Sequence, residues 1–255
     1  MPAVFLGHGS PMNAIEENAW RASWQTLAKQ LPRPRAILVV SAHWETQGPA
    51  VTAAAAPGTI HDFYGFPQAL FDVRYPAPGD PALAARMADL LAPEGVILDP
   101  ARGLDHGVWG VLAPMYPGAD IPVVQLSLPV GLTPAQHAAR ARKLTPLRDE
   151  GVMIVGSGNI VHNLRYWRHA EPRFLKAWDD FNEAVIAEIK AGNHAALADY
   201  NRLAPQAELS VPSEEHYLPL LYVTAVQHAG EPVEVFNDAG VGAIRMTSVI
   251  VGRQR

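Results

Sequence analysis

The most regular feature of the chain is a series of short apolar runs separated by longer segments with helical spacing. The runs are rich in Val, Ile and Leu, which is typical of strands buried on both faces, and they occupy residues 3–6, 36–41, 96–98, 122–128 and 152–157. In the intervening segments apolar residues recur three or four positions apart, as in an amphipathic helix, most clearly in 20–31, 83–90, 134–148 and 173–191. Strands that alternate with helices predict an α/β fold.

The end of the chain adds two expected strands, 232–236 and 243–251, which should pair near an edge of the sheet. The sequence contains no internal repeat and no Gly/Ser linker, and its 23 prolines are spread through the expected loops. We therefore expect a single α/β domain over residues 1–255, with a central, mostly parallel but mixed sheet flanked by helices.

Composition and charge narrow the possible partners. With 49% hydrophobic and 18% charged residues, the 255-residue chain resembles an ordinary globular protein. Its net charge is −5 and its 20 basic residues are scattered, so nucleic acid is not an expected partner. No apolar run reaches the roughly 20 residues of a membrane helix, and the first residues lack the pattern of a secretory signal. These features predict a cytoplasmic protein without a membrane partner, and they leave its oligomeric state open.

The chain has no cysteine and ten histidines. Thiolate nucleophiles, disulfides and cysteine-ligated metals are therefore excluded. Any metal must be bound by His, Asp or Glu, so the positions of the histidines become the main evidence for function.

Two histidines follow the first two apolar runs. His8 lies in GHGSP after residues 3–6, and His43 lies in SAHW after residues 36–41. In an open α/β sheet, ligands collect at the carboxyl ends of the strands, where both side chains would lie. A simple glycine-rich turn is the alternative interpretation of GHGSP, but two histidines in equivalent places favour a metal site.

Three more histidines occur in comparable positions. His162 follows the run 152–157, and His106 precedes an expected helix over 108–116. Either could instead make a structural hydrogen bond or cap a helix. His216 would lie one turn into a helix capped by Ser213, with its side chain pointing inward as a possible third ligand.

The loop 57–67 is long and carries aromatic and ionisable residues, which suits a wall of a site better than a spacer. Its His61 and Asp62 could contact substrate or orient a ligating imidazole. The alternative is that the neighbouring Phe63, Tyr64 and Phe66 simply cover the core. Ser10 and Tyr217, each close to a candidate ligand, are further candidate substrate contacts. The remaining histidines occur in polar or alanine-rich helical stretches and are predicted to lie on the surface: His137, His169, His194 and His228.

Taken together and in order, six motifs resemble those of the class III extradiol ring-cleaving dioxygenases, in the branch that is similar to DOPA 4,5-dioxygenases. The motifs cover nearly the whole chain and are GHGSPMNAIE (7–16), SAHWET (41–46), HDFYGFP (61–67), LDHGVWGVL (104–112), SGNIVHNL (157–164) and EEHYLPLLYV (214–223).

This resemblance implies a LigB-like domain with a mononuclear non-haem metal bound by His8, His43 and His216. It implies that His162 is an acid/base catalyst beside the metal, or alternatively a ligand when the substrate is absent, and that His106 is a second polar group near bound oxygen or substrate. The substrates would be O2 and a small aromatic diol, and the product a muconic semialdehyde. Ferrous iron is expected for activity, and zinc could be present in the purified protein. In aromatic-acid relatives the third ligand is a glutamate, whereas here His216 occupies that position beside Glu215.

Two other functions fit part of the pattern. A three-histidine site is also a common zinc arrangement, so a zinc-dependent hydrolase is the main alternative. A protein that only binds a metal or a catechol is a third possibility. The presence of both His106 and His162 disfavours simple binding, because binding requires no proton transfer.

Overall fold

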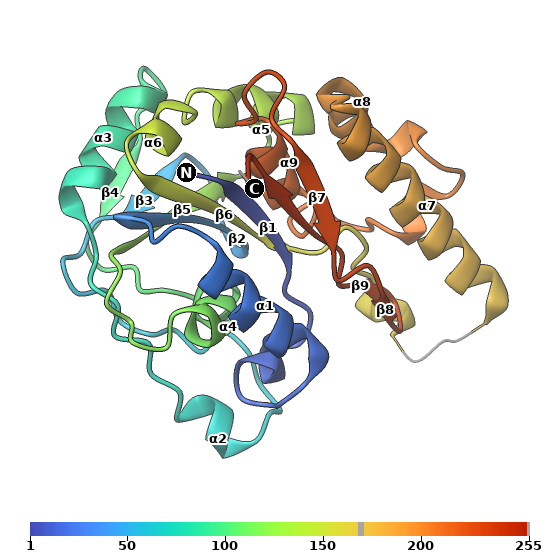
Figure 1. Cartoon of the computed structure of the whole chain (residues 1–255), viewed down its shortest axis with the longest axis horizontal. Coiled ribbons are helices and arrows are strands. Elements are labelled where there is room, and N and C mark those ends of the chain that lie inside the picture. Colours follow the sequence, from blue (N-terminus) through green and yellow to red (C-terminus); the bar gives the residue numbers. More distant parts are fainter. Residues whose placement is uncertain (168–170, 254–255) are drawn as a thin grey trace.

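A sheet of eight strands runs through the middle of the protein (Figure 1). The computed structural model describes residues 1–167 and 171–253. In their order across the sheet, the strands are β4 (Ile97–Asp99), β3 (Ala50–Thr52), β5 (Val123–Pro129), β2 (Ala36–Thr46), β6 (Val152–Gly158), β1 (Ala3–Gly7), β10 (Ser248–Val251) and β7 (Val233–Phe236).

The four central strands are parallel, antiparallel pairs join the outer strands to them, and the outermost pair of β3 and β4 is parallel again. Strands β5, β2, β6 and β1 pair in parallel, whereas β3 pairs with β5, and β10 with both β1 and β7, in antiparallel fashion. The predicted mixed sheet is thus confirmed, as is the pairing of the C-terminal strands near its edge. The short strand β3 was not predicted, because it has only three residues and leads into an alanine-rich stretch.

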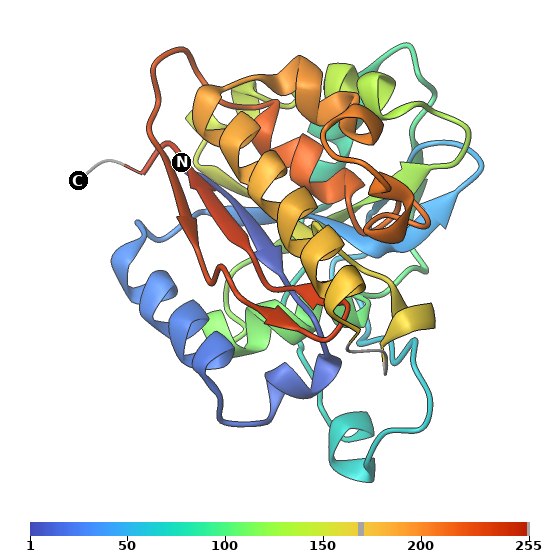
Figure 2. The ribbon, with the colours of Figure 1, turned by 90° about the vertical axis from the view of Figure 1, so that its right-hand side faces the viewer.

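Helices cover both faces of the sheet (Figures 1 and 2). Helices α1 and α4 lie on one face, and α3, α5, α7 and α9 on the other. The helices are α1 (Ala19–Gln30), α2 (Gln68–Phe71), α3 (Pro81–Leu91), α4 (His106–Met115), α5 (Pro134–Arg142), α6 (Pro146–Asp149), α7 (Pro172–Ala191), α8 (His194–Ala198) and α9 (Leu218–Thr224). The described residues also contain four 3₁₀ turns: η1 (Pro11–Ala14), η2 (Leu164–Tyr166), η3 (Tyr200–Arg202) and η4 (Ala207–Leu209).

The central strand β2 explains why the sequence shows continuous apolar runs rather than alternation. Its Ile37 and Val39 pack in the core under α1 and α4, while Leu38 and Val40 pack in the core on the opposite face. Because both faces are covered, every side chain in this part of the strand is apolar. The parallel strands therefore form a rigid platform whose carboxyl ends are free to carry a site.

Two expected elements are interrupted in the structure. The segment 134–148 forms α5 and α6 rather than one helix, since Pro146 has no N–H to continue the ladder. The segment 243–251 forms two strands, β9 (Ile244–Arg245) and β10, and β9 pairs with β8 (Gly240–Val241) in a separate small sheet. Within the described ranges, no helix combines the length and apolar character needed to cross a bilayer.

Candidate metal centre and active site

Five histidines from distant parts of the sequence meet at the carboxyl ends of the central strands. His8 directly follows β1, and its backbone N–H donates to the carbonyl of Gly158 at the end of β6 (3.0 Å). His43 lies near the end of β2, beyond Ser41, the last residue of that strand that pairs with β6. His162 follows β6 by four positions. The strand-end placement inferred from the sequence is therefore what brings these side chains together.

His216 reaches the same place from the other direction. It lies in the turn before α9, rather than one turn inside a helix as expected from the sequence. Pro219 lies in the first turn of α9, where proline is favoured, and the Ser213 hydroxyl bonds to Glu215 instead of capping a helix. The carbonyl of His216 accepts from the N–H of Asn159 (2.8 Å), which fixes the turn against the exit of β6.

The imidazoles of His8, His43 and His216 converge. Their ring centres lie 5.0 to 5.2 Å apart, and one ligand atom from each lies within 4.8 Å of the others. The Nε2 atoms of His8 and His43 are 3.2 Å apart. Two nitrogens bound to one metal at about 2.1 Å are separated by roughly 3 Å, so this spacing fits a shared ion.

In two of these rings the outer nitrogen, Nδ1, already has a partner. Nδ1 of His8 lies 3.0 Å from the Ser157 hydroxyl, and Nδ1 of His216 lies 3.0 Å from a carboxylate oxygen of Glu215. The buried Nε2 of His216 has no hydrogen-bond partner among the described residues. Metal-binding histidines usually hold Nδ1 in this way and turn Nε2 to the ion. The donor set therefore fits a metal.

The local electrostatics keep the three rings neutral. Burial, followed by the neighbouring histidines, holds the pKa of His8 and of His216 well below the usual value. Burial also lowers the pKa of His43 to about 3. A neutral imidazole has the free lone pair that a metal requires, so these residues are ready to bind one near neutral pH.

Two further histidines flank the three. The His162 ring stacks on His216 with a centroid distance of 3.5 Å and an interplanar angle of 6°, and burial lowers its pKa to about 4. The His106 ring lies 3.9 Å from that of His43. Both rings are therefore close to the candidate ligands, but neither belongs to the group formed by His8, His43 and His216.

His106 is held by Asp62. Nδ1 of His106 lies 2.9 Å from a carboxylate oxygen of Asp62, and the same oxygen accepts from the backbone N–H of His106 (3.0 Å). Burial alone would raise the pKa of Asp62, but the hydrogen bonds and charge of His106 outweigh it and lower the pKa to about 2. The ionised carboxylate thus orients the imidazole.

The five histidines form the polar part of a cavity of about 570 Å³. Its other walls are largely apolar, and Leu164 and Trp167 are 61% and 40% exposed at its rim. The remaining lining residues are Gly9, Ser10, Pro11, Phe63, Phe66 and Ile244. A cavity of this size and character suits a small aromatic molecule.

The predicted substrate contacts lie in different places. Ser10 lines the cavity, whereas Asp62 lies behind His106. His61 packs on Trp109 and lies 3.0 Å from the carbonyl of Val73, outside the lining. Tyr217 is fully buried and donates its hydroxyl to the carbonyl of Leu197, so the structure does not bring it to the cavity.

The prediction of surface histidines holds only in part. His194 and His228 are partly exposed and lie away from the cavity. His137 is buried instead, with Nδ1 3.0 Å from the Tyr222 hydroxyl, because the face of α5 that carries it packs against α9. His169 lies outside the described residues.

Some residues of the site have weak sequence signals. Phe63 and Phe66 line the cavity, as expected of a loop that forms a wall of a site, and both also pack against the core. Trp167 and Ile244 line it as well and lie in no motif used above. Asp105, which caps α4 below the site, had a usable signal: an aspartate immediately before an apolar helix is a preferred cap.

Comparison with known proteins identifies the family. Residues 2–246 match the family described as the catalytic LigB subunit of aromatic ring-opening dioxygenase. The chain belongs to this family. It is therefore an extradiol ring-cleaving dioxygenase with a non-haem metal site, as the motifs predicted, and the hydrolase alternative is not supported.

Individual relatives agree with this membership. The chain is 52% identical over 257 residues to a protein of Escherichia coli (strain K12) named 4,5-DOPA dioxygenase extradiol, covering 99% of this chain and 95% of the relative. It is 38% identical over 250 residues to a protein of the same name from Beta vulgaris, covering 94% and 92%. A crystal structure titled an uncharacterized protein from Escherichia coli K12 has a TM-score of 0.84 and 45% identity, covering 99% and 100% of the two chains.

Proposed function

We propose that this dioxygenase opens the ring of a DOPA-like catechol at ferrous iron bound by His8, His43 and His216. The observation that carries the proposal is the convergence of three neutral imidazoles at the base of an apolar cavity, with two further histidines beside them. The DOPA-like substrate is suggested by the names of the relatives, and the catechol class by the family.

Three protein ligands on one side of an ion leave other positions free for a bidentate catechol and for oxygen. Ferrous iron would supply the electron transfer between the diol and O2, which zinc cannot do. Zinc bound in purified protein would then be an inactive substitute. A zinc hydrolase would need none of the aromatic walls that surround these histidines.

We assign His162 the proton transfers of the reaction. With its pKa lowered to about 4 by burial, the ring is neutral near pH 7 and can accept a proton from a catechol hydroxyl. The stacking on His216 keeps it beside the ligands while leaving it outside their convergent set. The same nitrogen can later return the proton, and such general acid/base help contributes about 10²- to 10⁴-fold.

His106 has a different task in this proposal. Nδ1 of His106 lies against the carboxylate of Asp62, which leaves Nε2 as the nitrogen available to the cavity. His106 would then bind and orient the substrate hydroxyl or O2, while Asp62 keeps the imidazole in place. Asp62 acts on the substrate only through His106.

The apolar walls complete the proposed substrate site. Phe63, Phe66 and Ile244 provide flat and apolar contacts for the aromatic ring and exclude water from the histidines. Ser10 lies at the more exposed end, where it can contact a polar substituent of the ring. The product would be a muconic semialdehyde.

We further propose that residues 1–255 form one catalytic domain and that the protein acts in the cytoplasm on small molecules. The lack of a Gly/Ser linker or repeat in the sequence supports the single domain, and the dispersed basic residues favour small molecules over nucleic acid.

The decisive experiment is anaerobic reconstitution with ferrous iron, followed by oxygen-uptake and visible-absorbance measurements. DOPA, catechol and protocatechuate are compared as substrates, and zinc-loaded protein is assayed in parallel with an ester. We expect iron-dependent oxygen uptake that is greatest with DOPA. Ester hydrolysis by the zinc form without oxygen uptake by the iron form would refute the proposal.

A further inference from the structure

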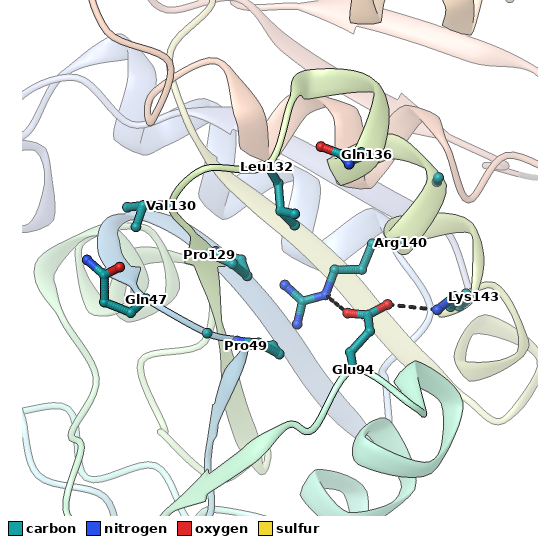
Figure 3. Close-up of a pocket in the computed structure, with 11 residues that line it drawn as sticks. Gln47, Pro49, Glu94, Pro129, Val130, Leu132, Gln136, Arg140 and Lys143 are labelled. Atoms are coloured by element: carbon teal, nitrogen blue, oxygen red, sulfur yellow. Dashed lines mark hydrogen bonds and ion pairs between the residues drawn. The ribbon is translucent and has the colours of Figure 1, made fainter.

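A second cavity lies on the α5 side of the sheet and shares no lining residue with the histidine cavity (Figure 3). Its volume is about 430 Å³. It lies between the turn from β2 to β3, the loop that follows β5, and helix α5, with Glu94 closing one side. Nothing in the proposed ring-opening reaction uses this cavity.

Arg140 is the unusual residue of the second cavity. Its side chain is only 2% exposed, although a guanidinium carries a charge and five N–H donors. Nε lies 2.9 Å from Glu94, and Nη1 lies 3.4 Å from the Tyr222 hydroxyl. Nη2 has no partner among the described residues. A buried charge with unused donors is costly unless an acceptor is supplied.

The unused donors face the cavity. Figure 3 shows the guanidinium inside the ring of lining residues, with its terminal nitrogens turned away from Glu94 towards Pro129 and Pro49. Lys143 shares Glu94 with Arg140, because its Nζ lies 2.7 Å from the other carboxylate oxygen. The lining residues thus include two cations and one anion, which leaves one unbalanced positive charge.

The rest of the wall is apolar. Pro129, Val130 and Leu132 line one side and Pro49 another, and Val130 is 40% exposed to solvent. A ligand that completes this cavity needs one negative charge with two acceptor oxygens, for the planar guanidinium, and an apolar body for the walls.

From this combination we propose that the second cavity binds a small organic monocarboxylate, whose carboxylate pairs with Arg140 and whose apolar body packs on Pro129, Val130 and Leu132. Glu94, which also pairs with Lys143, holds the guanidinium in place. The site is separate from the reaction centre, so its ligand need not be a catechol.

Isothermal titration of the metal-loaded protein tests the proposal, with cyclohexanecarboxylate as the probe. We expect cyclohexanecarboxylate to bind with a dissociation constant of about 10 mM or lower. This is at least ten-fold tighter than the binding of either cyclohexanecarboxamide or acetate. The amide lacks the charge, and acetate lacks the apolar body. No binding, or equal binding of all three probes, would overturn the proposal.

Three variants place the binding in this cavity. Arg140→Gln should weaken cyclohexanecarboxylate binding at least ten-fold, whereas Arg86→Gln, which removes an exposed arginine paired with Glu150, should leave it unchanged. Ala139→Glu introduces a carboxylate at an exposed lining position and should also weaken binding ten-fold, so the test survives if Arg140→Gln does not fold. Unchanged binding in folded Ala139→Glu protein would show that the probe binds elsewhere.

Discussion

At the scale of single residues, the histidines of the site differ in the contacts that hold each imidazole ring. His8 and His216 have their outer nitrogens held by Ser157 and Glu215, an arrangement that fixes a metal ligand. His162 instead stacks on His216, and no hydrogen bond from the described part of the chain holds its ring nitrogens, so they are available for proton transfer. These contacts predict different consequences for replacing each histidine.

Replacing His43 or His162 with alanine separates the two roles. His43→Ala removes one of three ligands and should abolish tight metal binding. His162→Ala should retain the metal but lose turnover by about 10²- to 10⁴-fold, because only the proton transfers are impaired. Metal content by elemental analysis and oxygen uptake with DOPA measure the two effects. Equal metal content and equal activity in both variants would contradict the assignment.

A buried carboxylate below the site connects the two histidines nearest to it. Asp105 is fully buried and accepts from the Ser41 hydroxyl (2.8 Å) and from Arg102 (3.2 Å), as well as from Gln125. The Ser41 oxygen in turn accepts from the backbone N–H of His43 (3.2 Å). Since Asp105 also caps the helix that begins at His106, it positions both histidines.

We therefore predict that Asp105→Asn and Asp62→Asn differ in their effect on the metal. Asp105→Asn should weaken metal binding by about ten-fold as well as slowing turnover, because His43 loses its anchor. Asp62→Asn should slow turnover with a smaller effect on the metal, since the hydrogen bond of Asp62 goes to His106, while His43 feels only its charge. Titration of the metal-free proteins with cobalt(II), followed by visible absorption, gives the affinities. Equal affinity in the two variants would show that Asp105 does not position His43.

At the scale of elements, the sequence was most informative where local pattern decides the structure. The buried parallel strands gave continuous apolar runs, and the positions of His8 and His43 after two such runs placed them at one sheet edge. The turn of His216 could not be located in this way, because it depends on a contact with β6 that has no local pattern. His137 was wrongly placed for the same reason, since its burial comes from α9 packing on an alanine-rich helix.

The contact that positions His216 can be tested through Gly158. A Cβ at this position would lie 2.2 Å from the carbonyl oxygen of His216, so Gly158→Ala must displace the turn. We expect a loss of roughly 1–3 kcal/mol in the free energy of unfolding and weaker metal binding. Gly110→Ala in α4 is the control, since a Cβ there meets nothing within 4 Å and alanine favours a helix. Denaturant unfolding and metal titration measure both effects, and identical behaviour of the two variants would contradict this account.

At the scale of the whole molecule, the protein buries several histidines in their neutral form. Burial lowers the pKa of His162 and of His137 to about 4, in two separate regions. In the unfolded chain the same groups have a pKa of about 6.5. Between these values the unfolded state binds more protons than the folded state, so folding becomes less favourable as the pH falls.

In the metal-free protein, these histidines should therefore make their full contribution to the free energy of unfolding above about pH 6.5. This contribution should decline steadily as the pH falls towards 4. Each such histidine contributes about 3 kcal/mol over this range, from 1.36 kcal/mol per pKa unit.

A bound metal should raise the melting temperature at pH 7.5, and this gain should shrink on acidification because protons compete for the ligands. His137→Gln should flatten part of the pH dependence with or without metal, because His137 lies outside the cavity. Melting temperatures from pH 4 to 8, with and without metal, test this, and a pH-independent metal effect would show that the bound ion does not depend on neutral histidines.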